Sequence, residues 1–162
     1  MARALIVGCG CRGSALAGGL LAAGWQVRGT TRSETRLDQL EAAGIEPIQA
    51  DPDHPGTVVD AIEGVAVVVW LMGTATGDPE VVGAIHGARL EAVIEELVDS
   101  GVRGLYYEGA GTVDGDHLRA GAEIVETSGG RWSMPVAVHL HDPSDHSLWL
   151  ESALGVVQGL IR

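Results

Sequence analysis

Short apolar runs rich in β-branched residues alternate along the chain with longer stretches that carry apolar residues at helical spacing. This alternation is typical of parallel strands, because each crossover to the next parallel strand needs a helix-sized connection. The run at residues 65–71 has no polar side chain apart from the indole of Trp70, as in a central strand covered on both faces. We therefore predict an α/β fold with a doubly wound parallel sheet.

The expected elements follow from where these patterns start and stop. We expect about six strands, at residues 3–7, 25–31, 45–49, 65–71, 103–107 and 135–140. We expect helices from the 8–13 segment to Gly24, from a Ser33 cap to Gly44, around 58–62, from an Asp78 cap to 98, around 118–125, and over about 144–161. Two successive βαβαβ halves give the strand order 3-2-1-4-5-6, which is the Rossmann fold.

Composition narrows the class of protein. The 162 residues suit a single domain spanning 1–162, with no separate substrate domain. Acidic residues outnumber basic ones by 22 to 10, and this net charge of −12 argues against nucleic-acid and membrane partners. No apolar stretch reaches the ~18 residues of a membrane span, and the first apolar run is too short for a signal peptide. We expect a cytoplasmic protein.

A glycine motif, GCGCRG, occupies residues 8–13, directly after the first expected strand and at the start of a helix. This is the place of the dinucleotide-binding GxGxxG motif. Gly8 would allow the tight turn, Gly10 the approach of a pyrophosphate, and Gly13 the close packing of helix on strand. Backbone amides at the helix start, around Cys11 and Arg12, would bind the anion. The alternative is a glycine-rich turn that binds no ligand.

The end of the second strand indicates which dinucleotide would bind. An NAD site places an acidic residue there for the ribose 2′-hydroxyl, whereas this strand ends in Thr30, Thr31 and Arg32. The Arg32 guanidinium can pair with a 2′-phosphate, with the threonine hydroxyls as neutral partners. We therefore favour NADP over NAD as the cofactor. The alternative for Arg32 is a solvated residue at the start of a helix.

Together, GCGCRG, the strand ending at Arg32, the 40–51 segment and the apolar fourth strand resemble atypical or extended short-chain dehydrogenases, the NAD(P)-dependent epimerase/dehydratase and NmrA-like group. The resemblance spans most of the chain. It implies that Asp51 lies beside the adenine. It also implies that Leu71, Met72 and Gly73 line the riboses.

The chain departs from that family where catalysis would occur. Members usually carry a Ser/Thr pair after the fifth strand, then a Tyr and a Lys. Here Gly109 and Ala110 stand at the hydroxyl positions and Asp114 at the Tyr position, and the 162 residues contain no Lys. The standard proton relay therefore cannot form from these residues. Schiff-base chemistry and a Walker A lysine are excluded for the same reason.

Tyr107 and Glu108 are the weak catalytic candidates, because they end the fifth strand at the edge where ligands bind in open α/β sheets. Tyr107 would donate a hydrogen bond to a carbonyl, or Glu108 would act as a base. We prefer the simpler interpretation, in which one tyrosine packs inward and Glu108 faces water or caps the loop.

A polar cluster follows the sixth strand. Strand alternation places His139 and His141 on one face, and Asp142, Asp145 and His146 lie close in sequence. The spacing matches no strong metal signature, so we expect no metal and interpret the cluster as a polar loop near the ligand crevice. A metal site and a titrating or substrate-contacting histidine are the alternatives.

Two further features leave alternatives open. Cys9 and Cys11 lie at a helix N-terminus, which can lower a thiol pKa and would suit redox sensing, although small residues that simply fit are commoner. The last helix carries Leu148, Trp149 and Leu154 on more than one face, which favours a homodimer through that helix.

These observations predict an NADP(H)-binding protein of one of two kinds. The first is an oxidoreductase with non-standard catalytic residues, acting on a small-molecule substrate. The second is a catalytically silent NADP(H) sensor or regulatory protein, which the missing Tyr-Lys relay favours.

Overall fold

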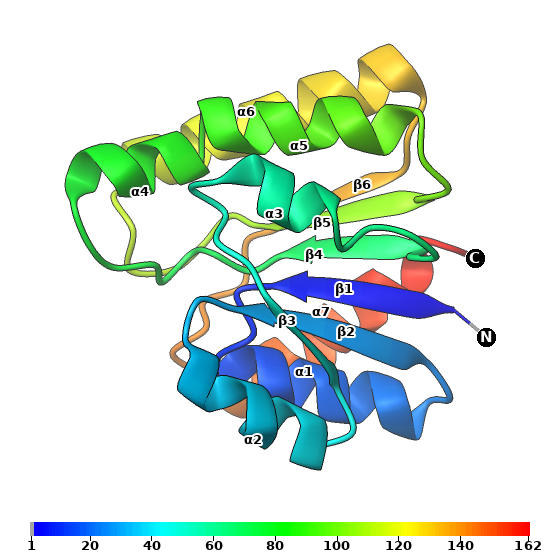
Figure 1. Cartoon of the computed structure of the whole chain (residues 1–162). Helices are drawn as coiled ribbons and strands as arrows, with labels where there is room; N and C mark the ends of the chain where they lie inside the picture. Colours follow the sequence, from blue (N-terminus) through cyan, green and yellow to red (C-terminus); the bar gives the residue numbers. More distant parts are fainter. Residues whose placement is uncertain (1) are drawn as a thin grey trace.

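The computed structural model describes residues 2–162 and contains one parallel sheet with helices on both faces (Figure 1). The strand order is β3-β2-β1-β4-β5-β6, so the predicted Rossmann topology is confirmed. The strands are β1 (Arg3–Val7), β2 (Gln26–Thr31), β3 (Glu46–Gln49), β4 (Val67–Trp70), β5 (Gly104–Glu108) and β6 (Val136–His139).

Helices cover the sheet in two layers. One face carries α1 (Cys11–Ala22), the 3-10 turn η1 (Glu34–Arg36), α2 (Leu37–Ala42) and α7 (His146–Gly159). The other carries α3 (Pro55–Val59), α4 (Pro79–Ile85), α5 (Ala88–Val98) and α6 (Gly115–Trp132). In the described part of the chain, no helix is long and apolar enough to cross a membrane.

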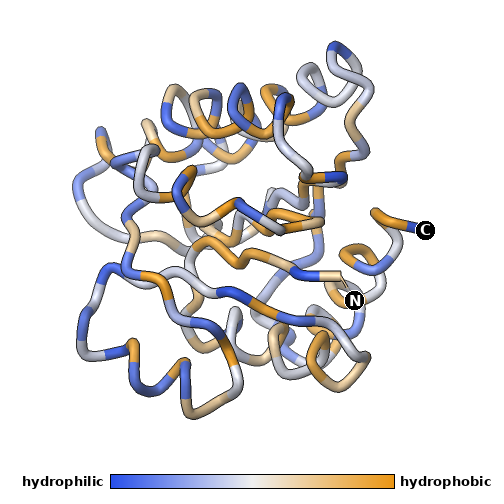
Figure 2. Tube along the Cα trace, turned by 45° about the vertical axis from the view of Figure 1, so that its right-hand side comes forward, coloured by the Kyte–Doolittle hydropathy of each residue, from blue (hydrophilic) through white to orange (hydrophobic). Residues whose placement is uncertain are grey.

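Alternate residues of the central strands build two separate cores. Val68 and Trp70 of β4 pack toward α3, α5 and α6, whereas Val67 and Val69 pack toward α1, α2 and α7. All four side chains are fully buried, as the apolar run predicted for a strand covered on both faces. The hydropathy colouring shows the same arrangement, with apolar strands in the middle and mixed helices outside (Figure 2).

The helix expected from Asp78 to 98 is instead two helices, α4 and α5. Its start is as predicted, because the Asp78 carboxylate accepts a hydrogen bond from the Glu80 backbone N–H at 2.8 Å. The break falls at His86 and Gly87. The fully buried His86 ring is hydrogen-bonded to the Tyr107 hydroxyl at 2.6 Å and to the Met72 carbonyl at 2.9 Å. These contacts with residues distant in sequence accompany the break between the two helices.

The expected helix cap at Ser33 needs correction. Ser33 makes no capping hydrogen bond to the backbone, because its hydroxyl pairs with that of Thr35 at 2.7 Å and the chain first forms η1. The last helix packs on two sides within the chain, and the homodimer expected through it stays a prediction. Trp149 is buried in the core and Leu154 packs against Gly19 of α1, while Leu148 remains exposed.

Candidate functional site

The glycine loop between β1 and α1 brings backbone close to two other segments. Gly8 has a φ of +89°, and a Cβ there would lie 2.7 Å from the Leu71 carbonyl oxygen and from the Met72 sulfur. A Cβ on Gly13 would lie 3.2 Å from the Gly8 carbonyl oxygen. At Gly10 nothing lies within 4 Å, so the loop has open space in front of its second glycine. This is the cradle that a pyrophosphate would need.

A cavity of about 230 Å³ lies beside this loop, at the carboxyl edge of β1, β2 and β4. It brings together six of the predicted cofactor residues, namely Gly8, Gly10, Thr31, Arg32, Leu71 and Met72. None of the residues that line it is acidic. Cys11 and Arg12 line an adjoining cavity of about 200 Å³, together with Thr74. The two cavities give a path from the end of β2 to the start of α1.

Asp51 and Gly73 are not among the residues that line these two cavities. The Asp51 carboxylate accepts a hydrogen bond from the Asp53 backbone N–H at 2.9 Å, and its neighbours Ala50 and Pro52 line the cavity instead. The Gly73 N–H donates to Glu108 at 2.7 Å. Both residues lie next in sequence to residues that line the cavity, and their place in the cofactor site stays a prediction.

Arg36 is a candidate cofactor residue that the sequence interpretation missed. Its side chain lines the same cavity as Arg32, and its Nε is buried with no hydrogen-bond partner among the described residues. Its Nη2 lies 3.4 Å from the Cys9 carbonyl oxygen. A buried, unpartnered donor beside a cavity is suited to an anion. The sequence carries no helical signal for it, because Arg32 lies in a bend and Arg36 ends the short turn η1, so only the fold brings the two arginines to one cavity.

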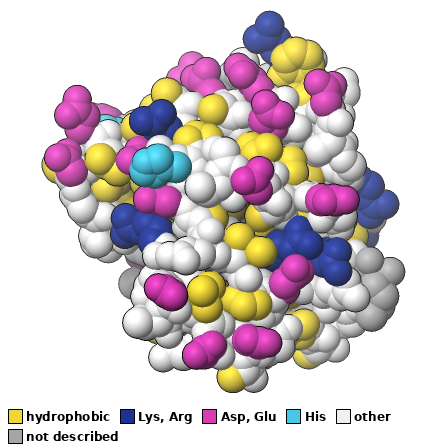
Figure 3. Space-filling view, viewed as in Figure 1, with side chains coloured by type: hydrophobic (Ala, Val, Ile, Leu, Met, Phe, Trp, Pro, Cys, Tyr) yellow, Lys and Arg dark blue, Asp and Glu magenta, His cyan; other side chains and the backbone are white. Residues whose placement is uncertain are grey.

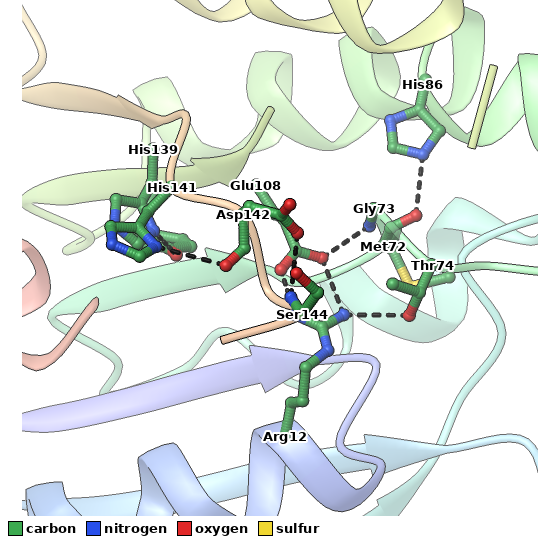
Figure 4. Close-up of polar contacts among 11 residues, drawn as sticks. Arg12, Met72, Gly73, Thr74, His86, Glu108, His139, His141, Asp142 and Ser144 are labelled. Carbon is green, nitrogen blue, oxygen red and sulfur yellow. Dashed lines mark hydrogen bonds and ion pairs between the residues drawn. The ribbon is translucent and has the colours of Figure 1, made fainter. Parts of the chain in front are cut away.

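A buried ion pair joins Arg12 to Glu108, 96 positions apart in the chain (Figure 4). The guanidinium donates from both terminal nitrogens to the carboxylate, and Nη2 also donates to the Thr74 hydroxyl at 2.9 Å. It also lies 5.0 Å from the ring centre of Trp149, within cation–π range. The Glu108 side chain is only 1% exposed. The interpretation that Glu108 faces water is therefore wrong.

This ion pair connects three parts of the sheet edge. Arg12 belongs to the start of α1, Thr74 to the loop after β4, and Glu108 to the last position of β5. Burial of a carboxylate is unfavourable unless charge and hydrogen bonds compensate, and here Arg12 and the Gly73 N–H do so. Glu108 could act as a base only after Arg12 is displaced.

Tyr107 is also fully buried, on the opposite face of β5 from Glu108. The Nε2–H of His86 donates to the Met72 carbonyl, so its Nδ1 accepts from the Tyr107 hydroxyl. Burial raises the pKa of Tyr107 and lowers the pKa of His86. Tyr107 thus fixes His86, and through it the Met72 carbonyl at the edge of the cavity.

The histidines at the end of β6 and in the segment that follows do not gather around one point. The rings of His139 and His141 stack with centroids 6.0 Å apart, whereas His146 stacks on Trp149. His139 is hydrogen-bonded to the hydroxyls of Tyr106 and Ser152. Within residues 2–162, no three His, Cys, Asp or Glu side chains are arranged to hold a metal ion.

The two thiols have different surroundings. Cys9 is 1% exposed, and burial raises the pKa of its thiol to about 11. The alternative in which the helix N-terminus lowers the thiol pKa does not hold for Cys9, because the cost of burying a thiolate dominates. Cys11 is exposed.

Comparison with known proteins gives a family and a fold. Residues 8–133 match the family model described as NAD(P)H-binding. A search of curated proteins finds no match.

Among solved structures, a short-chain dehydrogenase/reductase superfamily protein from Agrobacterium tumefaciens with bound NAD superposes with a TM-score of 0.70 at 18% identity, covering 84% of this chain and 48% of that one. The triphenylmethane reductase of Citrobacter sp., complexed with NADP(H), superposes with a TM-score of 0.65 at 18% identity, covering 85% of this chain and 48% of that one. The UDP-glucuronic acid 4-epimerase of Bacillus cereus, in complex with UDP-glucuronic acid and NAD, superposes with a TM-score of 0.67 at 15% identity, covering 84% of this chain and 55% of that one.

The chain spans about half the length of these solved proteins, and at such identities the likeness shows the fold. The predicted resemblance to short-chain dehydrogenases and epimerases is confirmed at that level, and a nicotinamide dinucleotide is the cofactor that family and fold support. From its glycine loop to the end of α6, the chain belongs to the NAD(P)H-binding family.

Proposed function

We propose that the protein binds NADP(H) in preference to NAD(H). The observation that carries this proposal is the pair Arg32 and Arg36 on a cavity with no acidic lining residue. A 2′-phosphate brings about two negative charges, and arginine pairs with phosphate through charged hydrogen bonds. The buried Nε of Arg36 gains a partner in this way, whereas a 2′-hydroxyl would leave both guanidinium groups without a counter-charge.

The rest of the cofactor is assigned by position. The open space at Gly10 and the first-turn amides of α1 would hold the pyrophosphate, since no side chain caps this helix. The cavity lined by Cys11, Arg12 and Thr74 would lead toward the nicotinamide end. When bound, the nicotinamide supplies a hydride donor or acceptor.

Substitution of Arg36 tests the proposal. Arg36→Ala should weaken NADPH binding by roughly 10-fold or more, the value of a charged hydrogen bond, and change NADH binding by less than about threefold. Arg119→Ala is the matched control, because it removes an exposed arginine of α6 that pairs with Asp116. Equal losses for NADPH and NADH in Arg36→Ala would show that this residue does not read the 2′-phosphate.

Whether bound NADP(H) reacts separates the two kinds of protein. We propose the oxidoreductase as one candidate, with a substrate wall supplied from outside these 162 residues. The sensor is the second candidate, and a specific observation favours it: Tyr107 and Glu108 are both buried and engaged by His86 and Arg12. NADPH oxidation with a panel of small carbonyl compounds distinguishes them, since turnover supports the enzyme and binding without turnover supports the sensor.

A further inference from the structure

A groove of about 420 Å³ runs between α5 and α6, on the face of the sheet opposite α1. Its apolar lining comes from Ile94, Ala120 and Ile124, of which Ala120 is exposed and Ile124 half-buried. Trp132 stands at one end, 45% exposed, and also lines an adjoining cavity of about 340 Å³. A large aromatic side chain left exposed at the end of an apolar groove is a common anchor for a protein partner.

The rim of this groove is acidic. Glu91 and Glu95 of α5 and Glu123 of α6 line it, and all three are exposed. Within residues 2–162, none of the three forms a salt bridge. The one basic residue that lines the groove, Arg131, lies against the face of Trp132. Figure 3 shows acidic side chains around exposed apolar atoms over the helices at the top of the molecule.

We propose that the α5–α6 groove docks a cationic amphipathic helix of a partner protein. An apolar lining between two helices accepts the apolar face of a third, and the unpaired glutamates complement lysine or arginine along its edges. From Ala120 to Trp132, α6 is about 18 Å long at ~1.5 Å per residue, so a helix of about 12 residues matches the groove.

The charge of the groove favours a cationic helix over other molecules that could bind there. A second copy of this chain would bring two sets of these three glutamates together, in molecules that each carry a net charge of −12. Nucleic acids and anionic lipid surfaces are repelled by the same rim.

The probe is a fluorescein-labelled helical peptide with leucines on one face and lysines on the other. Its control has the same composition but a permuted order with no apolar face. Fluorescence anisotropy should show that the first peptide binds at least tenfold more tightly than the permuted one. Trp132→Ala and the triple variant E91Q/E95Q/E123Q should each weaken that binding at least tenfold.

The matched control is E34Q/E41Q/E151Q, which removes three exposed glutamates from the opposite layer and should leave binding unchanged. Equal losses in the two triple variants would overturn the proposal, because the peptide would then respond to net charge alone. Lack of binding to the wild-type protein would also overturn it. So would a dimer in analytical ultracentrifugation that Trp132→Ala dissociates, since the groove would then hold a second copy.

Discussion

Glu108→Gln should destabilise the fold, because it removes the charge that compensates Arg12 inside the sheet edge. Glutamine keeps the volume of the side chain and an oxygen for the Gly73 N–H, but its amide nitrogen replaces the oxygen that accepts from Arg12 Nη1, so the loss combines the charge with that hydrogen bond. Removing one partner of a fully buried ion pair costs about 3–5 kcal/mol. The Arg12 side chain is 17% exposed and keeps its contacts to Thr74 and Trp149, so we expect about 2–3 kcal/mol.

Urea unfolding followed by circular dichroism measures this loss. With a slope of about 1–3 kcal/mol per molar urea, the midpoint should fall by roughly 1 M. A domain of this kind has about 5–15 kcal/mol of stability, so the variant should remain folded in the absence of urea.

Glu46→Gln is the matched control, because Glu46 forms an ion pair with Arg28 at 3.0 Å but is 50% exposed. Its cost should stay below about 1 kcal/mol. Adding Arg12→Met to Glu108→Gln should recover part of the lost stability, since no uncompensated charge then remains. If Glu108→Gln costs no more than Glu46→Gln, the reasoning about the buried pair is refuted.

Two further predictions concern the thiols and pH. In the native protein, iodoacetamide should label Cys11 rapidly and Cys9 only as the fold opens, because Cys9 is buried with a raised pKa; a fast phase that survives in Cys11→Ser would contradict this. Burial lowers the pKa of both His86 and His139, so below about pH 6.5 the unfolded chain binds more protons than the folded one. As the pH is lowered through this range, the free energy of unfolding should therefore fall by up to about 1.4 kcal/mol per pH unit for each histidine. Urea midpoints measured between about pH 7.5 and 5.5 test this, and a flat profile would contradict it.

The topology could be predicted from the sequence because it follows from local pattern. Strand order depends only on the alternation of elements and on the reversal between the two halves. The interruption between α4 and α5 could not be predicted in this way. The apolar residues continue at helical spacing across it, while the contacts of His86 are with Met72 and Tyr107, which lie 14 and 21 positions away.

The site could be predicted in part. The glycine loop and Arg32 could be identified from the sequence, because each directly follows a strand that the local pattern predicts. The partner of Glu108 carries no such signal, since Arg12 is one of ten basic residues and lies 96 positions away. A carboxylate at the end of an otherwise apolar strand does indicate that a buried partner is needed, and this is the clue that the water-facing interpretation of Glu108 overlooked.

The central claim is that the cavity beside the glycine loop binds NADP(H) and recognises its 2′-phosphate. Isothermal titration of the unmodified protein with NADPH and then with NADH tests it most directly. The account predicts that NADPH binds at least about tenfold more tightly than NADH, because only NADPH offers a counter-charge to Arg32 and Arg36. Binding of neither dinucleotide, or NADH binding as tightly as NADPH, would contradict it.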